Sequence, residues 1–385
     1  MYFTEEHHVF RKSFRDFLKK EVVPHVEKWE QTGKIERFIW EKFGEMGYFG
    51  LSYSEEYGGL DLDLFYMVIF LEELQKINSG GFAAAIWAHT YLAMTHLNKE
   101  GDAQIKKKYL APSITGQKIG CLCITEPSAG SDVAGIRTTA TMEGEFYTIN
   151  GSKTFITNGV YSDYLIVAAK TNTTSKHSGI SIFIIDRETP GISATKLDKL
   201  GWKASDTGEI AFDNVKIPTK NLLGEEGKGF AYIMEHFALE RLIMGINAHA
   251  RAKYALDYVI DYTSERKAFG KQLDKFQALR HKIAEMASKV EMCKEFNYSI
   301  AKRMDQGTYV VKEATMSKLL STKMADEVIY DALQLLGGYG YMEEYPLARL
   351  FRDSRLGPIG GGTSEILKEI IAKIIIDKKE YKSLT

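Results

Sequence analysis

The chain has 385 residues, with 50 lysines and arginines against 51 aspartates and glutamates, so its formal net charge is −1. This balance argues against a protein that binds nucleic acid or an acidic membrane through a field of positive charge. No apolar run approaches the ~18 residues that cross a bilayer, and the length predicts two or three domains of about 100–200 residues each.

The first part of the chain, residues 1–118, has the spacing of helices. Its opening, Met1–Glu6, resembles neither a secretory signal nor an arginine-rich transit peptide, which favours a cytoplasmic location. Phe10, Phe14 and Phe17 then recur at helical intervals with charged residues between them. We therefore predict an N-terminal helical domain.

The middle part, residues 119–224, has the short period of strands. Asn150-Gly151 is a strong hairpin signal and Pro190-Gly191 marks a second turn. We predict a compact antiparallel β domain with strands that include Phe146–Ile149, Thr154–Thr157, Tyr164–Ala168, Ile180–Ile185 and Glu209–Phe212.

The last part, residues 225–385, returns to long helical periods, so the pattern alone predicts an α–β–α order of domains. The three cysteines have no metal-ligand spacing, and no metal is expected. They are Cys121, Cys123 and Cys293.

The most specific segment is Leu122–Asp132, where an apolar strand runs straight into a turn rich in proline, glycine and serine. Such a junction presents backbone N–H groups and small hydroxyls at a sheet edge, where a flat polar ring can be held. The segment closely resembles the signature of the acyl-CoA dehydrogenases, flavoenzymes that oxidise acyl-CoA thioesters to 2,3-enoyl-CoA. The resemblance spans the chain and continues, in order, through Lys153–Asn158, Ser205–Thr207, Glu265–Gly270 and Gly361–Ile366.

This resemblance implies an α+β fold: an N-terminal helical domain, a central antiparallel β-sandwich-like domain and a C-terminal four-helix bundle. It also implies FAD as cofactor, a homotetramer, and an electron-transferring flavoprotein as electron acceptor in fatty-acid or branched-chain β-oxidation. By the same resemblance, one set of residues borders the flavin ring: Leu122, Ile124, Thr125, Ser131, Phe155 and Thr157. A second set contacts the pyrophosphate and adenosine half, the last three from a neighbouring subunit: Arg266, Phe269, Gln277, Gln334, Gly337 and Gly338.

Thr363 and Glu365 match positions at the same nucleotide, and glycines precede them in what reads as an N-capped helix start. Such a helix end offers free N–H groups and a positive dipole end to an anion, although a plain glycine loop is the alternative. For Phe155 and Phe269 the alternative is ordinary core packing, and for Arg266 it is a solvated charge on a helix.

The catalytic base departs from the common pattern of the family. Many members carry it in Tyr-Glu-Gly-Thr before the last helix, but here Gly361 occupies the place of the glutamate. A second candidate is Glu240, because on a helix it shares an apolar face with Phe237, Ile243 and Met244. Desolvation there raises the pKa of a carboxyl toward a value useful for proton abstraction. This arrangement resembles the long-chain and isovaleryl branches of the family, whose base lies on this helix.

Alternatives to Glu240 remain. It could be an exposed helix residue or half of a buried ion pair, although Arg241 is rotated about 100° away on the helix and is not positioned to neutralise it. Glu126 and Glu365 are rival carboxylates, but both match flavin-side positions. The Gly361 N–H is suited to bond the thioester oxygen as charge develops there. The residues expected to bind substrate are Ser131, Arg241, Gly361 and Gly362.

Three other functions fit parts of the pattern: a flavin oxidase or monooxygenase, a dehydrogenase of acyl groups on a carrier protein, and a non-catalytic scaffold. Peroxide release separates the first, comparison of the two thioester carriers the second, and a colourless protein would indicate the third. Gly360-Gly361 frees space near the reacting carbons, which admits a 2-methyl branch or a long straight chain equally, with a preference here for medium to long straight chains.

Overall fold

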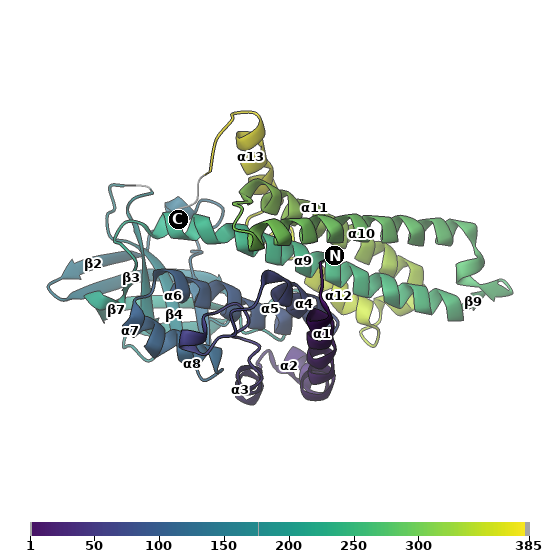
Figure 1. Ribbon diagram of the computed structural model, residues 1–385, viewed down its shortest axis with the longest axis horizontal. Helices are drawn as coiled ribbons and strands as arrows, with labels where there is room; N and C mark the ends of the chain where they lie inside the picture. Colours follow the sequence, from purple (N-terminus) through teal and green to yellow (C-terminus); the bar gives the residue numbers. More distant parts are fainter. Residues whose placement is uncertain (1, 176, 382–385) are drawn as a thin grey trace.

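The computed structural model describes residues 2–175 and 177–381 (Figure 1). Helices form the N-terminal part, a sheet the middle part and long helices the C-terminal part, as predicted. Phe14 of the first helix is fully buried, as its spacing predicts, and its ring packs against Phe43 and Phe70. The N-terminal α-helices are α1 Glu5–Phe17, α2 Val26–Thr32, α3 Arg37–Glu45, α4 Leu64–Gln75, α5 Gly80–Trp87, α6 Met94–Glu100, α7 Ala103–Ile105 and α8 Ala111–Ile114.

The middle part is a mixed sheet. Within the described residues it has eight strands in the order β6-β7-β3-β2-β4-β5-β8, with β1 pairing on β4. Most neighbours are antiparallel, as predicted, but β1 and β2 each pair with β4 in parallel. The strands are β1 Gly120–Cys123, β2 Thr139–Glu143, β3 Phe146–Ile156, β4 Tyr164–Lys170, β5 Ile180–Asp186, β6 Ile192–Lys196, β7 Gly208–Pro218 and β8 Leu222–Leu223.

The predicted hairpin at Asn150-Gly151 is wrong, because β3 runs through both residues as one strand. The pairing of β3 with β7 shifts register between Ile149 and Gly151, which marks a β-bulge. A Cβ atom on Gly151 would lie 2.5 Å from Thr138 Oγ1 and 2.7 Å from Thr138 Cα. Glycine is therefore required here because the segment that carries Thr138 approaches the backbone closely. The second predicted turn, Pro190-Gly191, does separate β5 from β6.

The C-terminal part is built around α9, Gly229–Glu265, whose 37 residues extend about 55 Å at 1.5 Å per residue. Figure 1 shows α9 beginning over the sheet and running to the far end of the bundle, where β9 and β10 form a small hairpin. None of the described helices has the length and apolar character that a membrane span requires. The remaining elements are β9 Lys267–Ala268, β10 Lys271–Gln272, α10 Gln277–Asp305, α11 Val311–Leu336, α12 Pro346–Ser354 and α13 Ser364–Ile375.

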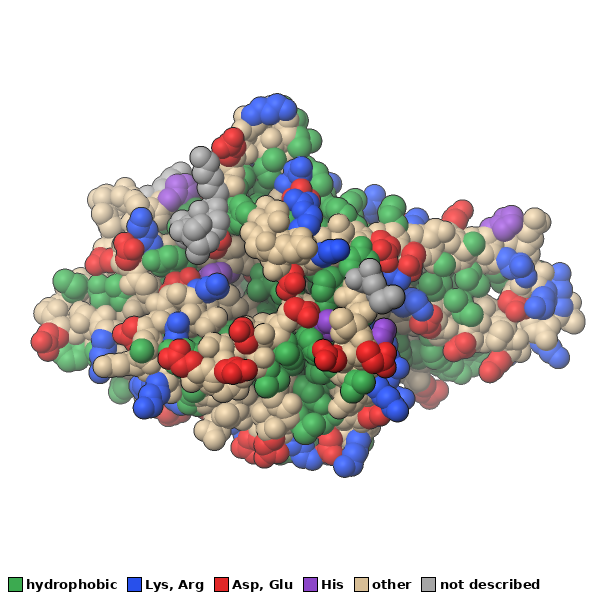
Figure 2. Space-filling view, viewed as in Figure 1, with side chains coloured by type: hydrophobic (Ala, Val, Ile, Leu, Met, Phe, Trp, Pro, Cys, Tyr) green, Lys and Arg blue, Asp and Glu red, His purple; other side chains and the backbone are tan. Residues whose placement is uncertain are grey.

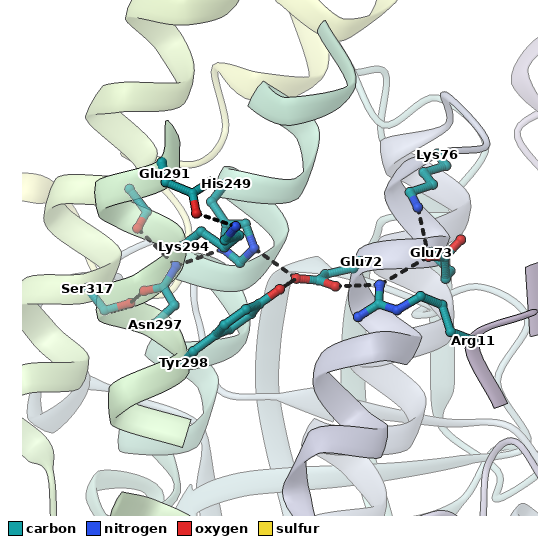
Figure 3. A network of polar contacts seen from close by, with 11 residues as sticks. Arg11, Glu72, Glu73, Lys76, His249, Glu291, Lys294, Asn297, Tyr298 and Ser317 are labelled. Carbon is teal, nitrogen blue, oxygen red and sulfur yellow. Dashed lines mark hydrogen bonds and ion pairs between the residues drawn. The ribbon is translucent and has the colours of Figure 1, made fainter. Parts of the chain in front are cut away.

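A buried polar network ties the N-terminal helices to the bundle (Figure 3). Its centre is the Glu72 carboxylate of α4, which accepts hydrogen bonds from Arg11 Nη1 at 2.7 Å, His249 Nε2 at 3.1 Å and the Tyr298 hydroxyl. Asn297 Nδ2 donates to His249 Nδ1 at 2.9 Å, which fixes the imidazole tautomer that donates to Glu72. Burial alone would raise the pKa of Glu72, but His249 and Arg11 lower it to about 2.

The surface carries both signs of charge. Figure 2 shows acidic and basic side chains interspersed over the visible face, with no continuous area of one sign. This agrees with the net charge of −1.

Candidate active site

Glu240 lies near the start of α9 with the neighbours that helical spacing predicts. Ile243 and Met244 are buried one turn after it, and Phe237 is half-buried one turn before it. The Glu240 side chain is itself half-buried. Burial raises the pKa of its carboxyl above the ordinary value, and the charges of Arg241 and Lys318 offset only part of this shift. A carboxylate in such a position is a stronger base than an exposed one.

The loop before α13 meets Glu240. Gly361 and Gly362 have φ values of +62° and +93°, in the left-handed region that favours glycine. A Cβ atom built on Gly361 would lie 3.0 Å from Glu240 Oε1. The loop position of Gly361 and the helix position of Glu240 therefore address the same small volume.

Arg241 is buried beside this volume but points elsewhere, as its rotation on the helix predicts. Its Nη1 donates to Thr315 Oγ1 at 3.2 Å, its guanidinium lies 5.6 Å from the centre of the Phe237 ring, and its Nε has no partner among the described residues. Its charge nevertheless lowers the pKa of Glu240, because a Coulomb interaction needs no contact. That influence was not expected from the sequence.

Lys318 was missed by sequence reasoning. It lies on α11 with a fully buried side chain, and its Nζ donates to the carbonyl oxygen of Gly362. A sequence signal did exist, since Lys318 falls on the stripe of buried positions of α11 that also contains Ala314, Ser321 and Ala325.

The signature turn after β1 is held from below by a buried ion pair. Lys153 Nζ, fully buried in β3, lies 2.7 Å from Glu126 Oε1 and donates to the Ile124 carbonyl at 3.0 Å. The backbone N–H groups of Arg137 and Thr138 also donate to Glu126. Burial would raise the pKa of Glu126, but Lys153 and these donors hold it below its usual value. Glu126 is thus a structural anion, and this removes it as a rival base.

The predicted ring-side residues lie along this turn and the adjoining end of β3. Thr154 N–H donates to the Thr125 carbonyl at 2.8 Å, which joins the two segments. Leu122 and Ile124 pack in the same apolar cluster as Phe237 of α9, so the turn lies against the helix that carries Glu240.

Two features of this edge suit a bound ring system. Phe155 has φ of +61° and is 70% exposed, so the alternative of core packing is wrong for this residue. The hydroxyls of Thr125, Ser131 and Thr157 have no hydrogen-bond partner within the described residues. An exposed aromatic ring beside free hydroxyl donors fits a flat polar cofactor such as a flavin.

The residues predicted for the pyrophosphate and adenosine half lie elsewhere. Phe269 is 96% exposed in the turn between β9 and β10, at the end of the bundle remote from the sheet (Figure 1). The Arg266 guanidinium lies 5.5 Å from the centre of the Tyr339 ring, next to Gly338. Arg266 and Phe269 therefore lie at the same end of the bundle as Gly337 and Gly338, and the division of this set between two subunits stays a prediction. Gln277 and Gln334 are exposed on α10 and α11.

The last two residues predicted to lie at the nucleotide are Thr363 and Glu365. Thr363 is the N-cap of α13. Its Oγ1 accepts from the Ile366 N–H at 3.4 Å, as expected of a capped start. Glu365 is exposed in the first turn of α13.

A His–Glu–His cluster braces α9 one turn before Glu240. Glu100 of α6 contacts His96 Nδ1 at 3.2 Å through one oxygen and His236 Nε2 at 2.9 Å through the other. The three ligand atoms lie within 4.8 Å of one another, a spacing that could hold a metal ion. Since both carboxylate oxygens already have hydrogen-bond partners, the cluster is explained as a link between α6 and α9.

Comparisons with known proteins agree with this geometry. Residues 4–117, 121–215 and 227–376 match the models of the acyl-CoA dehydrogenase N-terminal, middle and C-terminal domains. The long-chain specific acyl-CoA dehydrogenase of Sus scrofa is 38% identical over 98% of this chain and 88% of its own length. The acyl-CoA dehydrogenase of Geobacillus kaustophilus superposes with a TM-score of 0.95 and 42% identity over 97% of this chain and 99% of its own. A glutaryl-CoA dehydrogenase from Mycobacterium smegmatis, solved in complex with FADH2, gives a TM-score of 0.92 and 26% identity over 99% and 97%.

Proposed function

Because the chain belongs to the acyl-CoA dehydrogenase family, we propose that Glu240 is the base of its reaction. The protein is an FAD-dependent oxidoreductase that acts on acyl-CoA thioesters. The carboxylate removes a proton from C2, next to the thioester carbonyl, and a C2–C3 double bond forms as a hydride leaves C3. FAD, when bound, supplies the acceptor for that hydride.

The observation that carries this proposal is the convergence of the loop and the helix. Gly361 cannot supply a base, but its missing side chain would begin 3.0 Å from Glu240 Oε1. The backbone N–H of Gly361 donates no hydrogen bond within the described residues, so it is available to the thioester oxygen as charge develops there. Glu240 and this N–H together supply a base and an oxyanion donor on one substrate.

A small cavity one helical turn from this site marks the direction in which we expect the acyl chain to extend. The cavity has a volume of about 20 Å³, room for one water molecule, and is lined in part by Met244, Thr322 and Gly357. Met244 lies one helical turn after Glu240 on α9, and Thr322 lies one turn after Lys318 on α11. Gly357 lies four residues before Gly361 in the loop. The bulky CoA must remain outside, so the acyl end takes the buried side. An acyl chain needs more room than the cavity offers, and the unbranched Met244 side chain is suited to move for it.

Two copies of the chain would complete each cofactor site. The ring-side residues lie by the sheet, whereas Arg266 and Phe269 lie at the opposite end of the same chain (Figure 1). A single copy would leave the adenosine half of FAD without the residues assigned to it. This supports assembly of at least a dimer, and we expect the homotetramer of the family, with an electron-transferring flavoprotein reoxidising the flavin.

Anaerobic mixing with a series of straight and branched acyl-CoAs tests the function directly. We expect the visible absorbance of the flavin to bleach with at least one saturated acyl-CoA and the product to be the trans-2-enoyl-CoA. Peroxide release at the rate of turnover in air would favour the oxidase alternative. Bleaching only by thioesters of a carrier protein would move the substrate to that class.

A further inference from the structure

Lys318 has a burial that is unusual for a lysine. Its side chain is fully buried, yet within the described residues no carboxylate lies within 4.0 Å of its Nζ. A lysine is rarely buried without an ion-pair partner, because removing the charge from water is costly. Its presence on the packed stripe of α11 therefore calls for a function.

The contacts of Lys318 lead to the proposed active site. Its Nζ donates to the Gly362 carbonyl, and its Cε lies 3.5 Å from the point where a Cβ of Gly361 would stand. Glu240 Oε1 lies 3.0 Å from that same point. One lysine thus touches the loop that carries the oxyanion donor and approaches the base.

We propose that Lys318 is a positioning residue of this active site: its ammonium group holds the Gly361–Gly362 loop against Glu240 and favours the carboxylate form of that base. The inference rests on the proposed function, since it needs Glu240 as the base. It adds a cation from α11 to the one that α9 supplies through Arg241.

The charged groups around Glu240 determine how removal of Lys318 changes the pKa of Glu240. Arg241 of α9 and Lys318 of α11 are the cations that act on Glu240. Tyr309 and Tyr381 are the titratable groups that act on Arg241 in addition to Glu240, and Glu235 acts on Tyr309. Burial lowers the pKa of Lys318 to about 8, with the charge of Glu240 opposing that shift, so Lys318 is mostly protonated at neutral pH.

The sign of the effect follows from this arrangement. Burial raises the pKa of Glu240, and the Lys318 charge opposes the rise. Without that charge, Glu240 keeps its proton to higher pH. The acid limb of the pH–rate profile, where the rate rises as Glu240 loses its proton, therefore moves to higher pH. An opposite charge at close range shifts a carboxyl by about one to three units, so a movement of at least about one pH unit is expected.

The experiment uses the FAD-bound enzyme and compares Lys318→Met with Lys318→Arg, and with Lys323→Met as the matched control. Methionine is close to lysine in volume, so the first variant removes the charge without a large cavity. Lys323 lies on the same helix but its side chain is 75% exposed, near Glu327. The measured quantity is the pH dependence of single-turnover flavin bleaching by a saturated acyl-CoA, with flavin content and KM recorded for each variant.

We expect Lys318→Met to move the acid limb up by at least about one pH unit, Lys318→Arg to restore it at least in part, and Lys323→Met to leave it unchanged. An acid limb that stays within about 0.3 unit of wild type in flavin-loaded Lys318→Met would overturn the inference, because the expected shift is several times larger. If Lys318→Met does not retain flavin, Lys318→Gln replaces it under the same limits.

Glu240→Gln is measured in parallel to separate the two proposals. Turnover retained by Glu240→Gln refutes Glu240 as the base, and with it the role of Lys318 toward that base. An inactive Glu240→Gln together with an unmoved profile in Lys318→Met refutes the role of Lys318 alone.

Discussion

Moving the carboxylate from α9 to the loop should restore part of the activity that its removal abolishes. In Glu240→Gln we expect proton abstraction to slow by ~10²–10⁴-fold, the usual contribution of a general base. Adding Gly361→Glu places a new side chain whose Cβ starts 3.0 Å from the former carboxylate oxygen. The new carboxylate therefore enters the volume where the base acted.

The structure also limits the recovery. Gly361 has φ of +62°, and a side chain in this region costs about 1–2 kcal/mol, a factor of roughly 5–30 in the population of the required loop conformation. We expect the double variant to bleach its flavin about tenfold or more faster than Glu240→Gln, yet to remain below wild type by a similar factor. The assay is anaerobic stopped-flow reduction by a saturated acyl-CoA at saturating concentration. A double variant no faster than Glu240→Gln, with equal flavin content and substrate binding, would refute the shared geometry while leaving Glu240 itself untested by that result.

Three predictions concern the scaffold around the site. The pKa of Glu72 falls from its ordinary value of 4.5 to about 2 in the native protein, so Glu72 contributes about 3 kcal/mol of stability above pH 4.5 that is lost as the pH falls through 2. Urea titrations of wild type and Glu72→Gln should therefore differ in unfolding free energy at pH 7 and converge toward pH 2. An equal difference at both pH values would contradict this. Lys153→Met leaves Glu126 as an unpaired buried anion and should destabilise the fold by about 3–5 kcal/mol. The double variant Lys153→Met with Glu126→Gln should recover most of that lost stability. If thermal unfolding finds the double variant less stable than Lys153→Met alone, the pairing is rejected. Gly151→Ala should destabilise the protein more than Gly144→Ala. Both glycines have a positive φ, which alone costs about 1–2 kcal/mol, but only the Cβ at position 151 also meets the Thr138 backbone; equal thermal midpoints for the two variants would contradict this.

The sequence predicted those features that depend on local pattern. Helical spacing located α1 and α9, and the cap at Thr363 was read from a single residue type in context. Glu240 stood out because a lone acid on an apolar helix face is visible without any knowledge of the fold.

Features that depend on tertiary contact were not predicted. Asn150-Gly151 has the pattern of a hairpin turn, but glycine is needed at position 151 because Thr138 of another segment lies close to it. That tertiary contact is not visible in the local sequence. Lys318 shares a helical stripe with Ala314 and Ala325, but what it contacts is fixed only when α11 packs against α9. The position of Arg266 beside Tyr339 likewise depends on the packing of α9 against α11, which places their C-terminal ends together.

The most direct test of Glu240 as the base separates proton removal from hydride transfer. A 3-thia-acyl-CoA has an acidic C2–H, but sulfur at the third position leaves no hydride to give. Incubated in D₂O with the FAD-bound wild-type enzyme, its C2 position should take up deuterium, and Glu240→Gln should slow that uptake by ~10²-fold or more while it binds the thioester normally. Uptake at the wild-type rate in flavin-loaded Glu240→Gln would contradict the account.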